Sequence, residues 1–307
     1  MGQIVGATLT THVPRLMIFD EAARRAYMGE KISTFYAALG RMYQERIAPL
    51  GLETFLIVDT HWWTTLDYII NAHERHEGVY TSDELPVMLH DYHYDYPGDR
   101  ELAELIAMEA KEAGIRAYAS AHRGLPIHYG TLNPMHYLNP RRDKRILPMS
   151  ILYTSSVHND LRFGELIGRA IEKSGRRVVF VASGGLSHEF WPFDTIHQHA
   201  SASAEEISSS LNREYDLKII DLLKKGRHAE VIALAEEFRE KCSPEGRFAH
   251  YLMMIGALGQ ARFTSAGIQY GEYEAAIGTG QAIFWFDAPI TPTASEQPST
   301  TSARSQL

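Results

Sequence analysis

Short runs of apolar residues, many of them β-branched, recur along the chain and predict buried strands. These runs span residues 4–9, 55–58 and 178–181. Continuous apolar runs of this length are typical of strands that are covered on both faces of a sheet. Each run leads within a few residues to a histidine.

Segments with helical spacing of apolar residues separate these runs. They cover residues 33–47, 101–113 and 163–173. Ser33 stands at the expected N-cap of the first segment, and Gly114 and Gly175 follow the other two, where a left-handed glycine commonly ends a helix. Strand and helix therefore alternate, which predicts an α/β fold with a central, largely parallel mixed sheet flanked by helices.

The second half continues with a block of helices and then returns to strand-like sequence. Helices are expected over about residues 204–224, 229–241 and 246–258, and the strand-like segment covers 275–286. We expect this last segment to close the same sheet, so that a single domain spans residues 1–287. Residues 288–307 are rich in Pro, Ser and Thr and nearly free of large apolar side chains, which predicts a flexible tail.

Composition and charge narrow the class of partner. The chain has 307 residues, of which 45% are hydrophobic and 22% charged, and its formal net charge of -8 argues against a general nucleic-acid surface. No apolar run approaches the roughly 18 residues of a membrane span, and the N-terminal sequence lacks the pattern of a secretory signal. We therefore expect a cytoplasmic protein that acts on a small molecule, with no membrane or nucleic-acid partner.

Three histidines follow the predicted strands at equivalent places. His12 lies in TLTTHVPRL, His61 in LIVDTHWWT and His188 in VASGGLSHEF. In open α/β sheets the ligand crevice lies outside the carboxyl ends of the strands, so these side chains are expected to converge there. Most of the 15 histidines must be ordinary surface or core residues, and the shared position is what distinguishes these three.

The residue types at this place suit a metal bound by nitrogen and oxygen. The single cysteine, Cys242, excludes a thiolate cluster, whereas two imidazoles and one carboxylate leave open positions on a six-coordinate metal. The carboxylate comes from a late helical region in which several glutamates are candidates: Glu236, Glu237, Glu240 and Glu245. Glu245 is favoured because it follows Pro244 and opens a predicted helix, although a glutamate there also complements the helix dipole.

His188 has two interpretations at this stage. Its Ser-Gly-Gly-Leu-Ser-His loop permits close approach of backbone to a ligand, and an imidazole that titrates near pH 6.5 can accept a substrate proton and return it. The alternative is a third metal ligand. Both place His188 at the same centre.

Several short motifs occur together in a characteristic order. They are THVP around His12, DTHW around His61, EGVYTSDELP at 77–86, YGTLNPM at 129–135, ASGGLSH ending at His188, NREYD at 212–216, and IGTGQAIF at 277–284. With these motifs, residues 3–287 resemble the class III extradiol ring-cleavage dioxygenases, the superfamily of protocatechuate 4,5-dioxygenase β subunits.

The resemblance implies a role for each candidate. His12 and His61 are implied to be iron ligands, Glu245 the carboxylate ligand, and His188 the acid-base residue. Several members carry a histidine where this chain has Tyr129, and the neighbouring His128 is displaced by one residue. Tyr129 is therefore expected to donate a hydrogen bond or to act as an acid in its place.

The resemblance also implies the reaction. Fe(II), or Mn(II) as in a few relatives, together with O2 cleaves a catechol, with 3,4-dihydroxyphenylacetate opened at the 2,3 position to a hydroxymuconic semialdehyde as the favoured case. Protocatechuate opened at its 2,3 position, or an aminophenol, is the alternative. A zinc-dependent hydrolase and a non-catalytic binding protein stay open as other classes.

The resemblance leaves the substrate contacts and the assembly open. Relatives form symmetric oligomers, so a homo-oligomer is expected. A substrate carboxylate needs a partner of opposite charge or a donor, and the candidates are Arg15, Arg123, His128 and Arg213. The segment EGVYTSDELP is expected to line the pocket entrance or to form a structural turn.

Overall fold

A single eight-stranded mixed sheet organises the chain, as the sequence predicts. In the computed structural model, which describes residues 1–29 and 31–288, the strand order is β6-β3-β7-β2-β8-β1-β12-β9. The strands of this sheet are β1 (Gln3–Thr10), β2 (Thr54–Thr64), β3 (Tyr68–Asn71), β6 (Ala117–Ser120), β7 (Arg145–Leu152), β8 (Arg177–Ser183), β9 (Ile268–Gln269) and β12 (Phe284–Phe286). Two separate two-stranded ribbons pair β4 (Arg75–Tyr80) with β5 (Tyr92–Pro97), and β10 (Glu274–Ala276) with β11 (Thr279–Gln281).

The middle of the sheet is parallel. β7, β2, β8 and β1 run in one direction, whereas β12 is antiparallel to β1 and β3 is antiparallel to β7. Alternate residues of β2 serve opposite faces, because successive side chains of a strand point to opposite sides. Leu56 and Val58 belong to one hydrophobic cluster, and Phe55 and Ile57 belong to the other. Because both faces of β2 are buried, neither set of alternate side chains is polar, which explains the continuous apolar run.

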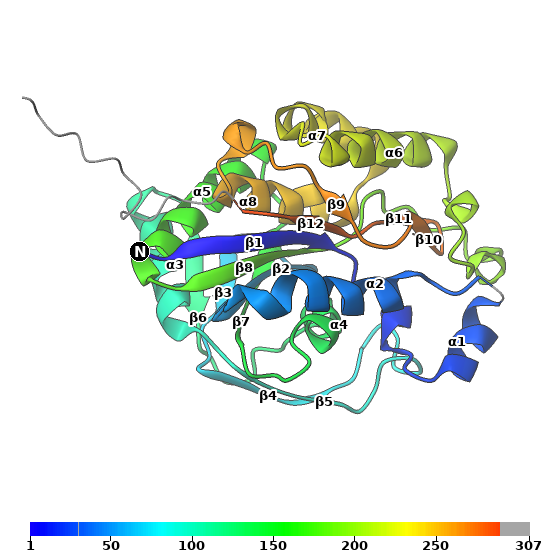
Figure 1. Ribbon diagram of the computed structural model, residues 1–307, viewed down its shortest axis with the longest axis horizontal. Coiled ribbons are helices and arrows are strands. Elements are labelled where there is room, and N and C mark those ends of the chain that lie inside the picture. The colour runs from blue at the N-terminus through cyan, green and yellow to red at the C-terminus, as the bar shows by residue number, and fades with distance from the viewer. Residues whose placement is uncertain (30, 289–307) are drawn as a thin grey trace, which may run out of the picture.

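Helices cover both faces of the sheet (Figure 1). They are α1 (Glu21–Met28), α2 (Phe35–Met42), α3 (Arg100–Glu112), α4 (Tyr129–Leu138), α5 (Val157–Ser174), α6 (Ser210–Lys224), α7 (His228–Cys242) and α8 (Ala249–Ala257). α3, α5 and α8 pack on one face together with the α6–α7 pair, and α2 and α4 pack on the other. The parallel middle of the sheet is thereby enclosed, as parallel sheets require.

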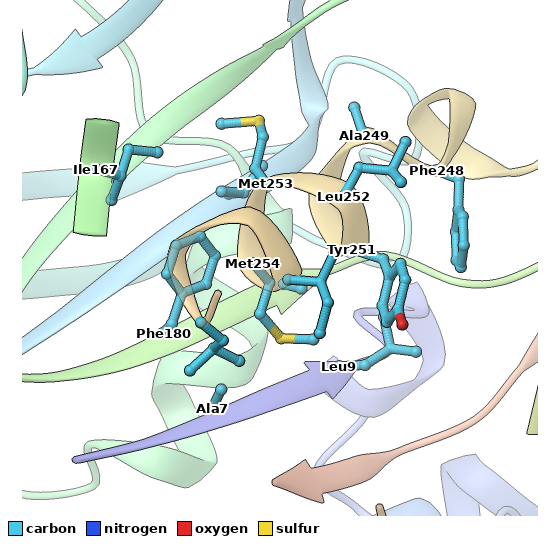
Figure 2. Packing of buried hydrophobic residues seen from close by; sticks show 14 of the residues in the cluster. Ala7, Leu9, Ile167, Phe180, Phe248, Ala249, Tyr251, Leu252, Met253 and Met254 are labelled. Atoms are coloured by element: carbon cyan, nitrogen blue, oxygen red, sulfur yellow. The ribbon is translucent and has the colours of Figure 1, made fainter. Parts of the chain in front are cut away.

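Helix α8 is the most enclosed of these helices. Its residues from Ala249 to Gly256 are all buried, which agrees with its nearly uninterrupted apolar sequence. Figure 2 shows Tyr251 and Met254 of α8 beside Ala7 and Leu9 of β1, within one cluster of buried side chains. This packing fixes the N-terminal end of α8, where Glu245 precedes the helix, against the sheet.

Three of the predicted boundaries are corrected by the structure. The helix expected from Ser33 has Thr34 at its N-cap position and begins at Phe35; the Ser33 hydroxyl instead accepts a hydrogen bond from the backbone N–H of Phe35 at 3.2 Å. Residues 43–47 continue as a π-helical turn. The segment 246–258 is helical only from Ala249, because the residues before it have left-handed backbone angles.

The strand-like sequence over 275–286 is also divided. Only β12 joins the main sheet, between β1 and β9, whereas the preceding residues form the β10–β11 ribbon. The turn between β10 and β11 consists of Ile277 and Gly278, which have φ values of 48° and 109°. In contrast, Gly114 and Gly175 follow α3 and α5 with positive φ, as predicted.

Two further expectations concern the surroundings of the domain. Among the described residues, no helix is both long and apolar enough to cross a membrane. The predicted flexible tail lies, from residue 289 onward, outside the described residues, and the domain limit at residue 287 stays a prediction.

A close approach of α5 and α8 provides a test of this packing. Gly164 of α5 faces Gly256 of α8, and a Cβ on Gly164 would lie 2.3 Å from the carbonyl oxygen of Met253. We expect Gly164→Ala to lower the free energy of unfolding by about 1–3 kcal/mol, because the helices must move apart. Gly40→Ala, in α2 with nothing within 4 Å of the added carbon, should raise it by up to about 1 kcal/mol. Urea unfolding of both variants measures the difference, and an unchanged Gly164→Ala variant would contradict the packing.

Candidate functional site

The sequence-predicted ligands converge at the carboxyl edge of the parallel strands. His12, His61 and Glu245 each offer one ligand atom, and these atoms lie within 4.8 Å of one another. His12 follows the end of β1 by two residues, and Glu245 precedes α8. The His12 and Glu245 side chains are almost fully buried, and that of His61 is 28% exposed. The group could therefore hold a metal ion with one side open.

His61 reaches this group from a bulge inside β2. The sequence predicts His61 just past the end of its strand, but β2 continues to Thr64. Its pairing with β7 jumps from Asp59 opposite Ser150 to Trp63 opposite Ile151, so the intervening residues bulge out of the ladder. Bulges of this kind redirect side chains next to active sites. The bulge turns both Thr60 and His61 toward Glu245.

Glu245 is held in place by two hydrogen bonds. Its Oε1 accepts from the hydroxyl of Thr60 at 2.5 Å, and its Oε2 accepts from the backbone N–H of Gly185 at 2.5 Å. The residues that follow, Gly246, Arg247 and Phe248, have φ values of 52°, 55° and 61°. Left-handed backbone at non-glycine residues costs about 1–2 kcal/mol each. Such strain is typical of functional sites that the surrounding structure over-determines.

The orientation of His12 depends on a chain of hydrogen bonds that starts in α4. Pro134 has no N–H to offer the carbonyl four residues earlier, which belongs to Gly130. That carbonyl instead accepts the hydroxyl proton of Ser183 at 2.5 Å. Because a serine hydroxyl has one proton, the Nδ1 of His12, 2.9 Å from the same oxygen, must be the donor in their contact. The Nε2 of His12 is therefore the atom that faces Glu245.

The contact between His12 and Glu245 requires a proton or a cation. His12 Nε2 lies 2.9 Å from Glu245 Oε1, and two lone pairs at that distance would repel each other. Burial lowers the pKa of His12, but the facing Glu245 carboxylate together with the charges of Asp59 and Glu84 raises it more, so the pKa lies above the ordinary 6.5. Burial raises the pKa of Glu245, yet His12 and His188 hold it well below 4.5. In the metal-free protein a proton lies between His12 Nε2 and Glu245 Oε1, and a metal ion would replace this proton. Metal affinity must therefore fall as the pH falls.

His61 is neutral at this centre. Burial and the neighbouring His12 lower the pKa of His61 to about 4, which leaves its nitrogens available as ligands. The hydroxyl of Tyr129 forms a short hydrogen bond with His61 Nε2 and lies 3.3 Å from a carboxylate oxygen of Glu84. The Tyr129 hydroxyl therefore lies against His61, and its expected role in place of a histidine stays a prediction. His128 lines the same small cavity, with Tyr80, Asp83 and Glu84, but no hydrogen bond joins its side chain to His61 in the described structure.

The YGTLNPM motif is explained by these contacts. Thr131 donates to Asp59 at 2.7 Å, and Asn133 donates to the backbone carbonyls of His12 and Val13 at 2.8 and 2.9 Å. A Cβ on Gly130 would lie 2.1 Å from Asp59 Oδ1, so only glycine fits there. The start of α4 therefore ties together the segments that carry His12 and His61.

His188 stands beside the His–His–Glu group. Its Nε2 lies 3.9 Å from Glu245 Oε2, and 27% of its side chain is exposed. Among the described residues, the group of potential metal ligands does not include it. Asp216 of α6, within the NREYD motif, holds the loop that carries His188. Its carboxylate accepts hydrogen bonds from the backbone N–H and the hydroxyl of Ser187 at 2.9 and 2.7 Å. Burial raises the pKa of Asp216 to about 6.

A cavity of about 320 Å³ opens over this centre. Its walls combine site residues with aromatic and basic side chains, and they include His61, His188, Glu245, Trp63, Tyr153 and Arg247. EGVYTSDELP borders the second cavity, of about 310 Å³, on the other side of His61. The segment therefore lines a cavity that His61 also borders, and whether this cavity belongs to the substrate entrance stays a prediction.

The remaining sequence candidates lie elsewhere. Glu236, Glu237 and Glu240 are exposed on α7, which leaves Glu245 as the carboxylate beside the histidines. Arg15 is buried in an ion pair with Glu274 at 3.1 Å. Arg123 and Arg213 are exposed and do not line the cavity over the centre.

Sequence reasoning missed four residues that hold the ligands in place. They are Thr60, Ser183, Asp59 and Asn133. Each stands beside or within a quoted motif, and each carries a short hydrogen-bonding side chain in a segment that is otherwise apolar or turn-like. A buried polar residue next to a candidate ligand is therefore the signal that could have found them.

Comparisons with known proteins show the family of the chain. Residues 6–282 match the family described as the catalytic LigB subunit of aromatic ring-opening dioxygenase. The chain is 32% identical over 266 residues to the 3,4-dihydroxyphenylacetate 2,3-dioxygenase of Escherichia coli, covering 86% of this chain and 93% of that protein. It is 24% identical over 296 residues to the 2-aminophenol 1,6-dioxygenase beta subunit of Pseudomonas sp, covering 92% of this chain and 93% of that protein.

A solved structure shares the fold. The crystal structure of an uncharacterized protein from Escherichia coli K12 superposes with a TM-score of 0.57 at 18% identity, covering 80% of this chain and 91% of that chain. The match over residues 6–282 places the chain in the class of aromatic ring-opening dioxygenases. The chain belongs to the LigB family and is an extradiol dioxygenase, which confirms the resemblance read from its motifs. Membership implies a metal cofactor, and the His–His–Glu group fits it.

The bond from Ser183 to His12 can be tested separately from the ligands. Ser183→Ala removes the acceptor that fixes His12 Nδ1, and we expect metal affinity to fall about 10- to 100-fold. Ser120→Ala is the matched control, because Ser120 is a buried serine of the edge strand β6 whose Oγ accepts from the backbone N–H of His122. Anaerobic titration of Fe(II) against a chromogenic chelator measures both. Equal affinities in the two variants would show that Ser183 does not orient the ligand.

Proposed function

We propose that this chain cleaves a catechol ring with O2 at an Fe(II) centre held by His12, His61 and Glu245. The observation that carries the proposal is the grouping of their three ligand atoms within 4.8 Å at the carboxyl edge of the sheet. When bound, Fe(II) supplies the passage of electrons between catechol and O2 that side chains of this kind cannot provide. Zinc has no redox chemistry, and Mn(II) is the second candidate.

His188 is the proposed acid-base residue. It lines the cavity, is partly exposed and stands 3.9 Å from Glu245 without belonging to the ligand group. The imidazole of His188 accepts a proton from a catechol hydroxyl, which makes the aromatic ring more electron-rich. The protonated imidazole of His188 then returns the proton to an oxygen atom as the catechol ring opens. Both atoms of O2 enter the product. The bond that breaks joins a hydroxyl-bearing ring carbon to the neighbouring ring carbon that carries no hydroxyl.

Tyr129 is the second proposed participant. Burial, followed by the negative charge of Glu84, raises the pKa of its hydroxyl, so it keeps its proton near neutrality. A protonated phenol beside His61 is a hydrogen-bond donor rather than a base. Its role is therefore to donate to a substrate or oxygen atom at the centre.

The proposed substrate is 3,4-dihydroxyphenylacetate, opened at the 2,3 position to a hydroxymuconic semialdehyde. Support comes from the relative of that name, which is 32% identical and aligns over 93% of its length. 2-Aminophenol is the alternative suggested by the relative that is 24% identical, and protocatechuate also fits the same centre. Assembly into a homo-oligomer stays a prediction.

Reconstitution tests the reaction. The protein is loaded with Fe(II) without air, mixed separately with 3,4-dihydroxyphenylacetate, protocatechuate, 4-methylcatechol and 2-aminophenol, and then exposed to O2. We expect a yellow ring-opened product and one O2 consumed per molecule of 3,4-dihydroxyphenylacetate, with slower turnover of the others. Loading with Zn(II) should give no product. The absence of O2 uptake with every compound would refute ring cleavage.

Substitutions separate the metal ligands from the acid-base residue. His61→Ala and Glu245→Ala should lose iron, because each removes one of three ligands. His188→Ala should keep its iron while turnover falls about 10²- to 10⁴-fold, the usual contribution of a general acid-base residue. His158→Ala, on the exposed surface of α5, is the control. Iron content and initial rate are measured on the same samples, and loss of iron from His188→Ala would make His188 a ligand instead.

A further inference from the structure

We propose that Arg247 forms an anion subsite that binds a carboxylate group on the side chain of the aromatic substrate. The inference rests on the proposed function and names the part of the cavity that selects among catechols. Arg247 lies two residues after Glu245 and lines the same cavity, with Trp63, Ile151 and Tyr153 beside it. A flat apolar wall next to a guanidinium suits an aromatic ring that carries an acidic substituent.

Of the two guanidinium groups at this cavity, one is already engaged. Arg239 forms an ion pair with Asp160 at 2.6 Å and is 7% exposed. Its Nε also donates to the backbone carbonyl of Arg247 at 2.6 Å. Arg239 is therefore a support for the Arg247 backbone, and its charge is neutralised within the core.

Arg247 has no such partner. Within residues 1–29 and 31–288, no carboxylate forms an ion pair with it, and its Nε is buried without an acceptor. Its guanidinium carbon lies over the ring of Tyr153, 5.7 Å from the ring centre. A buried donor without an acceptor is rare in folded proteins. The terminal nitrogens of the guanidinium also donate no hydrogen bond within the described residues, and a carboxylate in the cavity would pair with them.

The backbone around Arg247 is fixed despite its unfavourable angles. Gly246, Arg247 and Phe248 form three successive left-handed residues. The N–H of Arg247 donates to the carbonyl of Pro244 at 2.9 Å, and Arg239 holds the carbonyl of Arg247. The turn therefore keeps Arg247 at a constant place relative to the ligand Glu245. The same turn carries Glu245, the proposed metal ligand, and the Arg247 guanidinium. A substrate would therefore meet the metal at its hydroxyl groups and Arg247 at its carboxylate.

The simplest alternative is that Arg247 only stacks on Tyr153 to stabilise the turn. A carboxylate subsite and a purely structural role for Arg247 differ in which substrates they affect. A carboxylate subsite discriminates 3,4-dihydroxyphenylacetate from 4-methylcatechol, which has the same hydroxyl groups and no charge. A purely structural role affects both compounds equally.

The test compares these two substrates in Arg247→Asn, Arg247→Lys and the control Arg262→Gln. Asparagine tolerates left-handed backbone, so Arg247→Asn adds no strain. Arg262 is exposed on the surface, away from the cavity. For Arg247→Asn we expect kcat/KM with 3,4-dihydroxyphenylacetate to fall about 10- to 100-fold, mainly through KM, as for a lost charge-assisted hydrogen bond. The value with 4-methylcatechol should change less than about threefold, and Arg247→Lys should recover part of the loss.

A binding measurement covers the case in which turnover is absent. Calorimetry compares 4-hydroxyphenylacetate with 4-methylphenol, neither of which is a catechol. The parent protein should bind the carboxylate compound more tightly, and Arg247→Asn should remove that preference. Equal losses for both compounds, or an unchanged preference, would overturn the subsite while leaving ring cleavage intact. Failure of the parent protein to cleave any catechol would instead refute the proposed function, and the calorimetric preference would still decide the role of Arg247.

Discussion

The contact between His12 and Glu245 is the interaction on which the rest of the site depends. A buried imidazole nitrogen and a buried carboxylate oxygen stand 2.9 Å apart, and each shifts the pKa of the other. Neither group could remain there alone, because an unpaired buried charge is strongly destabilising. The pair holds either a proton or a metal ion between its atoms, so the same geometry stabilises the metal-free fold and forms the start of the metal centre.

Parallel strands make this contact possible. The ends of β1 and β8 meet at one edge, and the bulge in β2 turns His61 toward the same place. Pro134 frees the carbonyl of Gly130, the carbonyl takes the proton of Ser183, and Ser183 thereby fixes which nitrogen of His12 faces Glu245. The buried helix α8 anchors the strained turn that delivers Glu245 and Arg247. Packing and hydrogen bonding offset the strain of that turn and keep the ligands preorganised.

The sequence predicts the parts of this arrangement that depend on strong local patterns. The apolar runs of β2 and β8 mark the centre of the sheet, and the histidines that follow the runs locate the site. Glu245 required the family resemblance, because Glu236, Glu237 and Glu240 have the same residue type in the same region. The short strands β3 and β6 were not predicted, because a strand of four residues carries too little pattern.

The geometry beyond these patterns depends on tertiary contacts. Nothing in DTHWWT indicates that the strand resumes after a bulge, since the bulge exists only relative to β7. Likewise, GRF contains one glycine but adopts three left-handed residues, because Arg239 and the packing of Phe248 hold the turn. Arg247 was therefore absent from the candidates for a substrate carboxylate, and Arg15, which was among them, is neutralised by Glu274.

The most direct test of this account is the crystal structure of the protein loaded with Fe(II) without air, with anomalous diffraction measured at the iron absorption edge. The account predicts one iron bound by the Nε2 of His12, a nitrogen of His61 and the carboxylate of Glu245, with Ser183 still bonded to the Nδ1 of His12. Iron at any other place, or coordination through the Nδ1 of His12, would contradict it.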